Sequence, residues 1–146
     1  MRFLLQRVQS AAVTVASEPI ASIGQGICVF VGIAESDTEA HLKPMLEKLL
    51  NLRIFANEKG LFDHSLLDIK GDLLWVSQFT LMADCKKGRR PFFGSAAKPE
   101  KAKQLYEKGF TLAQGYPLGT VACGQFGADM QVSIMNDGPV TLMLDA

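Results

Sequence analysis

Residues 73–82 constrain the fold of this chain more than any other stretch. They begin as an apolar run and end with Ser77, Gln78 and Thr80 among apolar neighbours. An apolar run of this length is typical of a strand buried on both faces. We predict a strand through the whole stretch, in which Gln78 and Thr80 share one face and Ser77 and Phe79 the other. Its polar end would lie at the rim of a hydrophobic core, where small-ligand sites tend to form. An edge strand with satisfied polar groups is the alternative.

The composition places the chain among ordinary globular proteins. Of its 146 residues, 48% are hydrophobic and 21% charged, which suits a single domain over residues 1–146 with a substantial core. The formal net charge is zero, so any nucleic-acid contact must come from a local patch. Three scattered cysteines without a CxxC pair indicate a reducing compartment, and the two histidines show no metal-ligand spacing. The apolar runs are too short for a signal peptide or a membrane span, so we expect a cytoplasmic protein.

The pattern of elements predicts an α+β fold. A helix is expected from a cap at Ser36 or Asp37 to about Leu52, with Pro44 as a local conflict, and a second at residues 99–114, weakened by Gly109. The other apolar segments suit a small, mainly antiparallel, barrel-like sheet with the two helices packed outside. The strands expected from alternation and turn signals are residues 1–8, 11–16, 20–23, 27–33, 52–56, 73–82, 121–123, 130–135 and 140–144.

The expected last two strands form a hairpin around an unusual turn. Asp137 and Gly138 suit a two-residue hairpin turn, but Pro139 then occupies the first hydrogen-bonding position of the last strand. A Gly-Pro bond can adopt the cis form at little cost, which would orient neighbouring carbonyls the same way. The alternative is a plain turn in which proline blocks an edge.

A basic loop stands out on this neutral chain. Residues 86–90 hold four cations, Lys86, Lys87, Arg89 and Arg90, which suit either a solvated loop tip or a phosphate contact. The adjacent Phe92 and Phe93 could stack on a base, although core packing is favoured.

No catalytic pair is visible in the sequence. Asp63, His64 and Ser65 are adjacent, whereas a Ser-His-Asp triad is built from separated segments. Thr80 has no evident basic partner, and no phosphate-cradling glycine motif is present.

Two motifs carry a family resemblance. The run SQFTL at residues 77–81 and the run NDGPVT at residues 136–141 resemble the two signatures of the D-aminoacyl-tRNA deacylases, also called D-tyrosyl-tRNA deacylases. The similarity extends over essentially the whole chain in the same order. Further agreement lies at residues 6–8, 51–55, 86–91 and 127–130.

The resemblance implies a fold, a reaction and a set of residues. Family members are homodimers of a small barrel-like domain that hydrolyse the ester between a D-amino acid and the 3′ end of tRNA, and that also act on glycyl-tRNA. It implies neither metal nor cofactor, and no membrane or DNA partner. The catalytic segment would be Ser77, Gln78, Phe79 and Thr80. Substrate would be bound by Phe126, Met130 and, from the partner subunit through a cis bond, Gly138 and Pro139, which would reject L-amino acids. The tRNA would be bound by Lys86, Lys87, Arg89 and Arg90.

The mechanism and the activity each have alternatives. Thr80 could be an acyl-accepting nucleophile, or backbone N–H groups near Phe79 and Thr80 could stabilise the oxyanion, which we favour. Two activities are alternatives to D-aminoacyl-tRNA deacylation. One is a sister editing enzyme with a trans Gly-Pro bond and activity on L-aminoacyl-tRNA, and the other is a non-catalytic RNA-binding module. Departures from the family pattern at Pro44, Gly109 and residues 61–64 affect local loops, and the preferred amino-acid side chain is not fixed by these residues.

Overall fold

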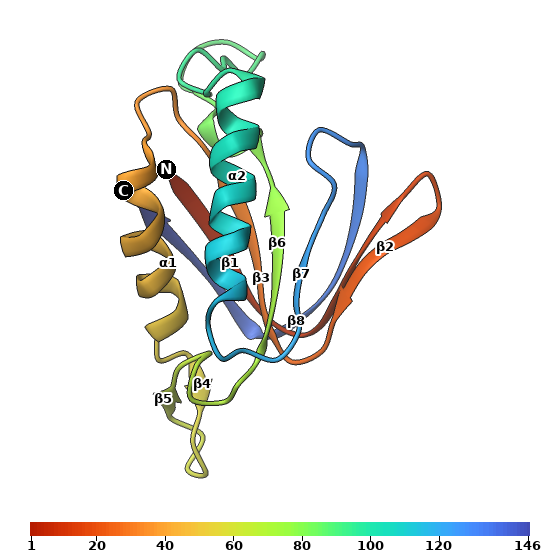
Figure 1. Cartoon of the computed structure of the whole chain (residues 1–146), viewed down its shortest axis with the longest axis vertical. Helices are drawn as coiled ribbons and strands as arrows, with labels where there is room; N and C mark the ends of the chain where they lie inside the picture. The colour runs from red at the N-terminus through yellow and green to blue at the C-terminus, as the bar shows by residue number, and fades with distance from the viewer.

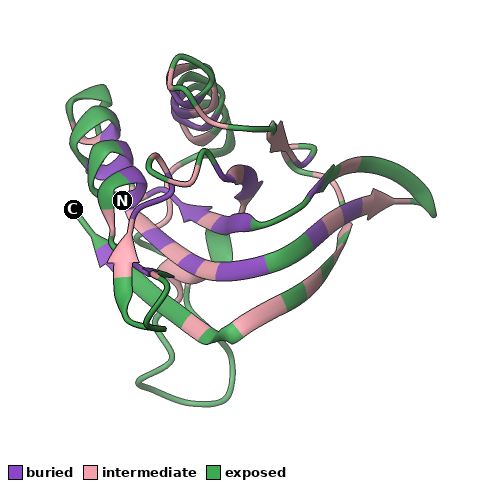
Figure 2. Ribbon diagram, turned by 90° about the horizontal axis from the view of Figure 1, so that it is seen from below, coloured by how far each residue is buried: buried purple, intermediate pink, exposed green.

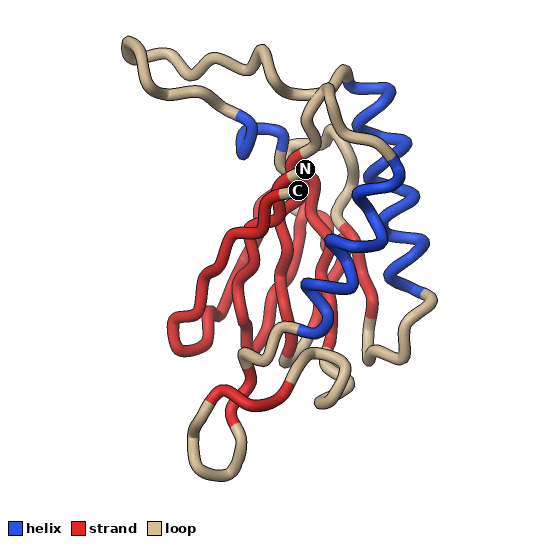
Figure 3. Tube along the Cα trace, turned by 90° about the vertical axis from the view of Figure 1, so that its left-hand side faces the viewer, coloured by secondary structure: helices blue, strands red, loops and turns tan.

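A computed structural model describes residues 1–146 as a curled six-stranded sheet with two helices packed against one face (Figures 1 and 3). The helices are α1 (Leu42–Asn51) and α2 (Pro99–Gln114). The strands of the sheet are β1 (Arg2–Val15), β2 (Glu18–Ile23), β3 (Gly26–Gly32), β6 (Asp72–Ser77), β7 (Val121–Cys123) and β8 (Met130–Asp145). Smaller elements are the strands β4 (Phe55–Ala56) and β5 (Phe62–His64) and the 3-10 turns η1 (Glu39–His41) and η2 (Phe79–Met82). No helix is long and apolar enough to cross a membrane.

The long strand β1 organises the sheet. Along one edge it pairs antiparallel with β8, and along the other it pairs antiparallel first with β3 and then with β2. The remaining pairs, β3 with β6 and β6 with β7, are parallel. Each parallel pair needs a crossover, and α1 and α2 lie on these two connections. The expected α+β fold with a mainly antiparallel, barrel-like sheet is confirmed.

The strand β6 is buried on both faces, as its apolar run predicted. Leu73 and Trp75 belong to a large cluster between the sheet and the helices, and Leu74 and Val76 belong to a second cluster inside the curl of the sheet. Buried residues therefore predominate in the central strands β3 and β6, whereas β8 carries many exposed positions (Figure 2).

The start of α1 differs from the sequence prediction. The chain first forms η1, and α1 begins only at Leu42, so Pro44 lies in the first turn, where its missing N–H group needs no partner. The predicted cap at Ser36 or Asp37 is wrong. Asp37 is instead buried, and its carboxylate accepts hydrogen bonds from the Met1 amino group at 2.5 Å and from the Ala34 N–H group at 2.6 Å. The N-cap of η1 is Thr38, whose backbone N–H donates to the His41 imidazole at 3.3 Å.

The helix α2 has the predicted bounds, and its glycine has a packing role. Gly109 is buried, and a Cβ atom added there would lie 2.8 Å from Cζ2 of Trp75. The glycine that weakens the isolated helix therefore allows the helix to approach the sheet closely.

The strand predicted through residue 82 ends at Ser77. Gln78 still donates its backbone N–H to the Val31 carbonyl at 2.8 Å, but β3 ends at Gly32 and offers no further partner. The chain then turns into η2. The predicted alternation of Gln78 and Thr80 against Ser77 and Phe79 is therefore wrong.

The predicted C-terminal hairpin is also wrong. The strand β8 continues from Met130 to Asp145 against β1, and residues 137–140 bulge out of it, because Gln6 pairs with Thr141 while Val8 pairs with Asn136. The Gly138-Pro139 bond within this bulge is cis. The strand expected at residues 52–56 is reduced to β4.

Candidate functional site

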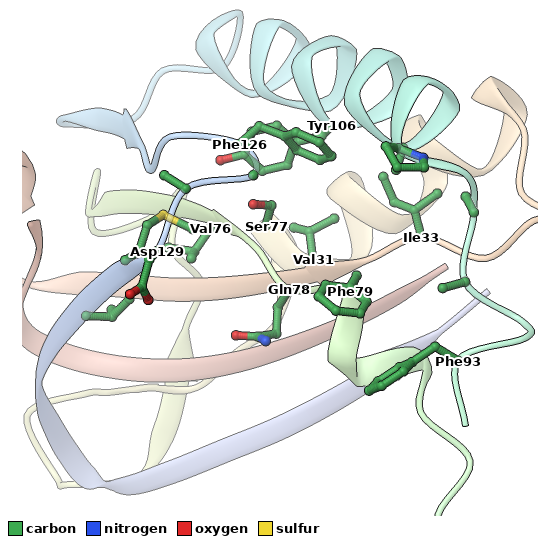
Figure 4. Close-up of a pocket in the computed structure, with 18 residues that line it drawn as sticks. Val31, Ile33, Val76, Ser77, Gln78, Phe79, Phe93, Tyr106, Phe126 and Asp129 are labelled. Carbon is green, nitrogen blue, oxygen red and sulfur yellow. The ribbon is translucent and has the colours of Figure 1, made fainter. Parts of the chain in front are cut away.

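A cavity of about 610 Å³ opens where β6 ends (Figure 4). Its walls come from the ends of β3 and β6, the first half of α2 and the segment that leads into β8. Thirteen of its 18 lining residues are hydrophobic, so the cavity suits an apolar or planar group that is oriented by few polar contacts.

Three of the four predicted catalytic residues line this cavity. Ser77 and Gln78 are half-buried, and Phe79 is 59% exposed and packs against Phe93 at a tilt, with 5.1 Å between ring centroids. Thr80 is exposed and is not a lining residue, although its hydroxyl oxygen accepts a hydrogen bond from the Gln78 side-chain amide. The turn η2 thus brings the Ser77 hydroxyl, the Gln78 amide and an aromatic ring to one wall.

The predicted substrate residues Phe126 and Met130 form part of the opposite wall. The Phe126 ring packs on Tyr106 with centroids 5.5 Å apart. Asp129 is the one carboxylate among the lining residues, and no histidine, cysteine or lysine joins it. Apart from the exposed Asp129, a hydroxyl nucleophile in this cavity therefore has no side-chain base among the lining residues.

Tyr106 links the two walls, and the sequence did not identify this role. Its hydroxyl lies 2.7 Å from the Trp75 carbonyl oxygen and 3.2 Å from that of Gly124, and the Trp75 indole donates to the Tyr106 carbonyl at 3.2 Å. Burial raises the pKa of the Tyr106 hydroxyl far above its usual value, so the group remains a donor. Periodicity marks Tyr106 as buried, but backbone carbonyl partners leave no signature in sequence.

Gly138 and Pro139 do not lie at the cavity of their own chain. Both are exposed, and neither is a lining residue. The bulge beside them is fixed from beneath by Arg7, whose guanidinium is buried and donates to the carbonyls of Ile54 and Asp137, the latter at 3.2 Å. Arg7 also pairs with the Asp137 carboxylate at 3.0 Å. Within a single chain, the motif at residues 77–81 therefore lies at the cavity and the motif at residues 136–141 lies away from it.

The basic loop lies beside the cavity, on a segment that also lines it. Lys86, Lys87, Arg89 and Arg90 are exposed, and none of them forms an ion pair. Phe93 and the alanines that follow it line the cavity. Core packing, predicted for both aromatic residues here, is wrong for Phe92.

Two features bear on metal and thiol chemistry. No group of three or more histidine, cysteine or acidic side chains is placed to hold a metal ion. Burial raises the pKa of the Cys28 thiol to about 12, whereas Cys85 is exposed on the basic loop and Cys123 is half-buried.

Comparison with known proteins connects this chain to a family. A family model described as D-Tyr-tRNA(Tyr) deacylase matches residues 4–145. The chain is 52% identical over 146 residues to the D-aminoacyl-tRNA deacylase of Clostridium botulinum (strain Alaska E43 / Type E3) and 49% identical to that of Thermosipho africanus (strain TCF52B), with 100% of this chain and 97% of each relative covered.

Two solved structures share the fold of this chain. A chain described as c-Myc DNA Unwinding Element Binding Protein superposes with a TM-score of 0.94 at 42% identity, covering 100% of this chain and 99% of its own. A probable eukaryotic D-amino acid tRNA deacylase superposes with a TM-score of 0.83 at 19% identity, covering 99% and 98%, which shows the shared fold.

Proposed function

The chain belongs to the D-Tyr-tRNA(Tyr) deacylase family, and from this premise we propose that it hydrolyses the ester bond joining a D-amino acid to tRNA. It is accordingly a hydrolase of the D-aminoacyl-tRNA deacylase class. The observation that carries the proposal is identity of about half of all residues to deacylases over the full length of the chain. Residues 1–146 would act as one domain, in the cytoplasm, where a chiral proofreading step would remove D-amino acids from tRNA.

The mechanism we propose uses backbone groups near Phe79 and Thr80. The turn η2 starts at Phe79, and the first N–H groups of a helical turn have no partner within it. Aimed at the scissile carbonyl, they would stabilise the developing oxyanion, and water would be activated with help from the terminal 2′-OH of the tRNA. Thr80 lies outside the cavity lining, and Asp129 is the only side-chain base within it, which supports this scheme over nucleophilic attack by Thr80.

Chiral selection is assigned to a second copy of the chain. The partner subunit's Gly138 and Pro139 would enter the cavity and place backbone atoms where an L side chain would otherwise extend. Exposure of the bulge and its fixation by Arg7 support this role. A glycine substrate has no side chain to exclude, so glycyl-tRNA would also be hydrolysed.

The same arrangement requires a homodimer with the active sites at the interface. Exposed apolar side chains support a subunit contact, since Phe62, Met135 and Met143 are each at least half exposed in one chain. A twofold interface would create two equivalent sites.

Binding of the tRNA is assigned to Lys86, Lys87, Arg89 and Arg90. Exposed cations without acidic partners are available for phosphate groups, and such contacts are independent of sequence and sensitive to salt. Charge-neutral variants of the four residues should raise KM and flatten its dependence on salt concentration. An unchanged KM with an unchanged salt dependence would remove this assignment.

The decisive experiment is hydrolysis of D-tyrosyl-tRNA, L-tyrosyl-tRNA and glycyl-tRNA by the purified protein with a chelator present. We expect loss of the D and glycyl esters while the L ester is spared. Loss of both tyrosyl esters would favour the sister editing activity on L-aminoacyl-tRNA. Loss of none, from a folded dimer, would favour a non-catalytic RNA-binding module.

A further inference from the structure

Phe92 is the most exposed of the large hydrophobic side chains that lie at the surface. It is 69% exposed, although burial of an aromatic ring is favourable and its neighbour Phe93 is half-buried against Phe79. The ring thus contributes little to the core. Most of the ring surface is therefore available for stacking on a partner.

The backbone fixes the position of this ring. The Asp84 N–H donates to the Phe92 carbonyl at 2.7 Å, and the Phe92 N–H donates to the Asp84 carbonyl at 2.9 Å. The tip of the ring packs over Gly94, where an added Cβ atom would lie 2.3 Å from Cζ of Phe92. The ring is therefore held in place while most of its surface stays accessible.

The loop beside the ring carries four cations and one carboxylate, that of Asp84, which accepts a hydrogen bond from the Lys86 backbone N–H at 2.9 Å. The pair between Asp84 and Phe92 closes the loop that holds Lys86, Lys87, Arg89 and Arg90. An exposed aromatic ring beside cations that have no acidic partner is the combination that binds single-stranded nucleic acid, because bases stack on the ring and phosphates lie near the cations.

The chain also gives the direction in which such a strand would run. Phe92 faces solvent, whereas the next residue, Phe93, lines the cavity. A nucleotide on Phe92 would therefore be a close neighbour of the group in the cavity. On the basis of the function proposed above, we propose that Phe92 stacks on an unpaired base in the 3′-terminal single strand of tRNA, next to the nucleotide that carries the amino acid.

The test compares two uncharged tRNAs, one intact and one trimmed of its single-stranded 3′ end, in titrations at fixed salt. Phe92→Ala should weaken binding of intact tRNA roughly five- to hundredfold, the range expected for one base stacked on an aromatic ring. It should leave binding of trimmed tRNA unchanged. Phe92→Tyr keeps the ring and should bind intact tRNA like the wild type, whereas Phe92→Leu, which keeps apolar area alone, should not.

Two further variants serve as controls. Ile20→Ala removes another exposed apolar side chain, on β2, and should change neither titration. Gly94→Ala forces the ring from its place and should reproduce the Phe92→Ala loss for intact tRNA, with Phe92 itself still present.

Three outcomes would overturn the proposal. They are equal binding of intact tRNA by Phe92→Ala and the wild type, equal loss for intact and trimmed tRNA, and a loss accompanied by a change in oligomeric mass, which would make Phe92 a subunit contact. If the wild type failed to hydrolyse D-tyrosyl-tRNA yet showed the Phe92-dependent difference, the proposed function would be wrong and the stacking would stand.

Discussion

Two strands of this sheet lose their regular pairing, and they do so in opposite ways. At the end of β6 the chain turns into η2 around an open, mostly apolar cavity, and Tyr106 joins the cavity walls through uncharged hydrogen bonds. In β8 the strand resumes after the bulge at residues 137–140, which faces outward and is held by the buried charge of Arg7. A cavity wall can be shaped by packing, whereas a segment presented to solvent depends on a strong interaction from beneath.

The largest expected loss of stability comes from substituting Arg7, which holds the bulge at residues 137–140. Arg7→Ala removes a buried guanidinium and leaves the Ile54 and Asp137 carbonyls without their donor, so it should lower the free energy of unfolding by about 3 kcal/mol. Urea unfolding monitored by the single tryptophan measures this. Arg7→Lys keeps the charge but not the forked geometry and should fall in between. A loss no larger than that of an exposed arginine would contradict the role given to Arg7.

Substitution of Tyr106 at the cavity should lower the free energy of unfolding by less than substitution of Arg7. Tyr106→Phe removes one neutral donor and leaves a buried carbonyl unpaired, so a loss of about 1–2 kcal/mol is expected, together with a higher KM as the walls separate. The matched control is Tyr116→Phe, because the Tyr116 hydroxyl reaches Glu47 only at 3.5 Å on the surface. Equal losses from the two variants would show that Tyr106 acts through general packing alone.

Combining the variants tests whether the regions are independent. No residue of the bulge lines the cavity of its own chain, so the effects of Arg7→Ala and Tyr106→Phe on unfolding should add to within about 0.5 kcal/mol. If the partner subunit's bulge enters the cavity, their effects on kcat/KM should not add. Additivity in both measurements would argue against a shared site.

The smallest effect is expected at Thr80. Its side chain is exposed and outside the cavity lining, so Thr80→Ala should change unfolding by less than about 0.5 kcal/mol and retain most of the turnover. Single-turnover hydrolysis of D-tyrosyl-tRNA is the measurement. Near-total loss from a folded protein that still binds substrate would restore Thr80 as the nucleophile.

Local patterns predicted the elements whose limits are set locally. The apolar spacing and the N-terminal proline of α2 define that helix completely, and the alternating sides of β6 follow from its run of apolar residues. The C-terminal end of β6 and the continuity of β8 are determined by the strands that pair with them. The strand β6 stops because β3 stops, and β8 passes through a sequence that resembles a hairpin turn because β1 is long enough to pair with both of its halves.

The candidate site shows the same division. Ser77, Gln78 and Phe79 are consecutive, so a short motif was enough to group them at one wall. Tyr106 and Arg7 act on backbone carbonyls of distant segments, and any residue type supplies a carbonyl. Such contacts become visible only when the fold brings those segments together.

The pairing of β1 with β8 also sets an order of events during synthesis. Residues 2–15 can pair with β2 and β3 early, but their other edge has no partner until residues 130–145 have been made. An unpaired edge of this length is a surface on which another nascent chain can add a strand. A chain that stops at Ala128 should therefore self-associate in sedimentation experiments. The strand that completes the sheet also protects the nascent protein from its own copies.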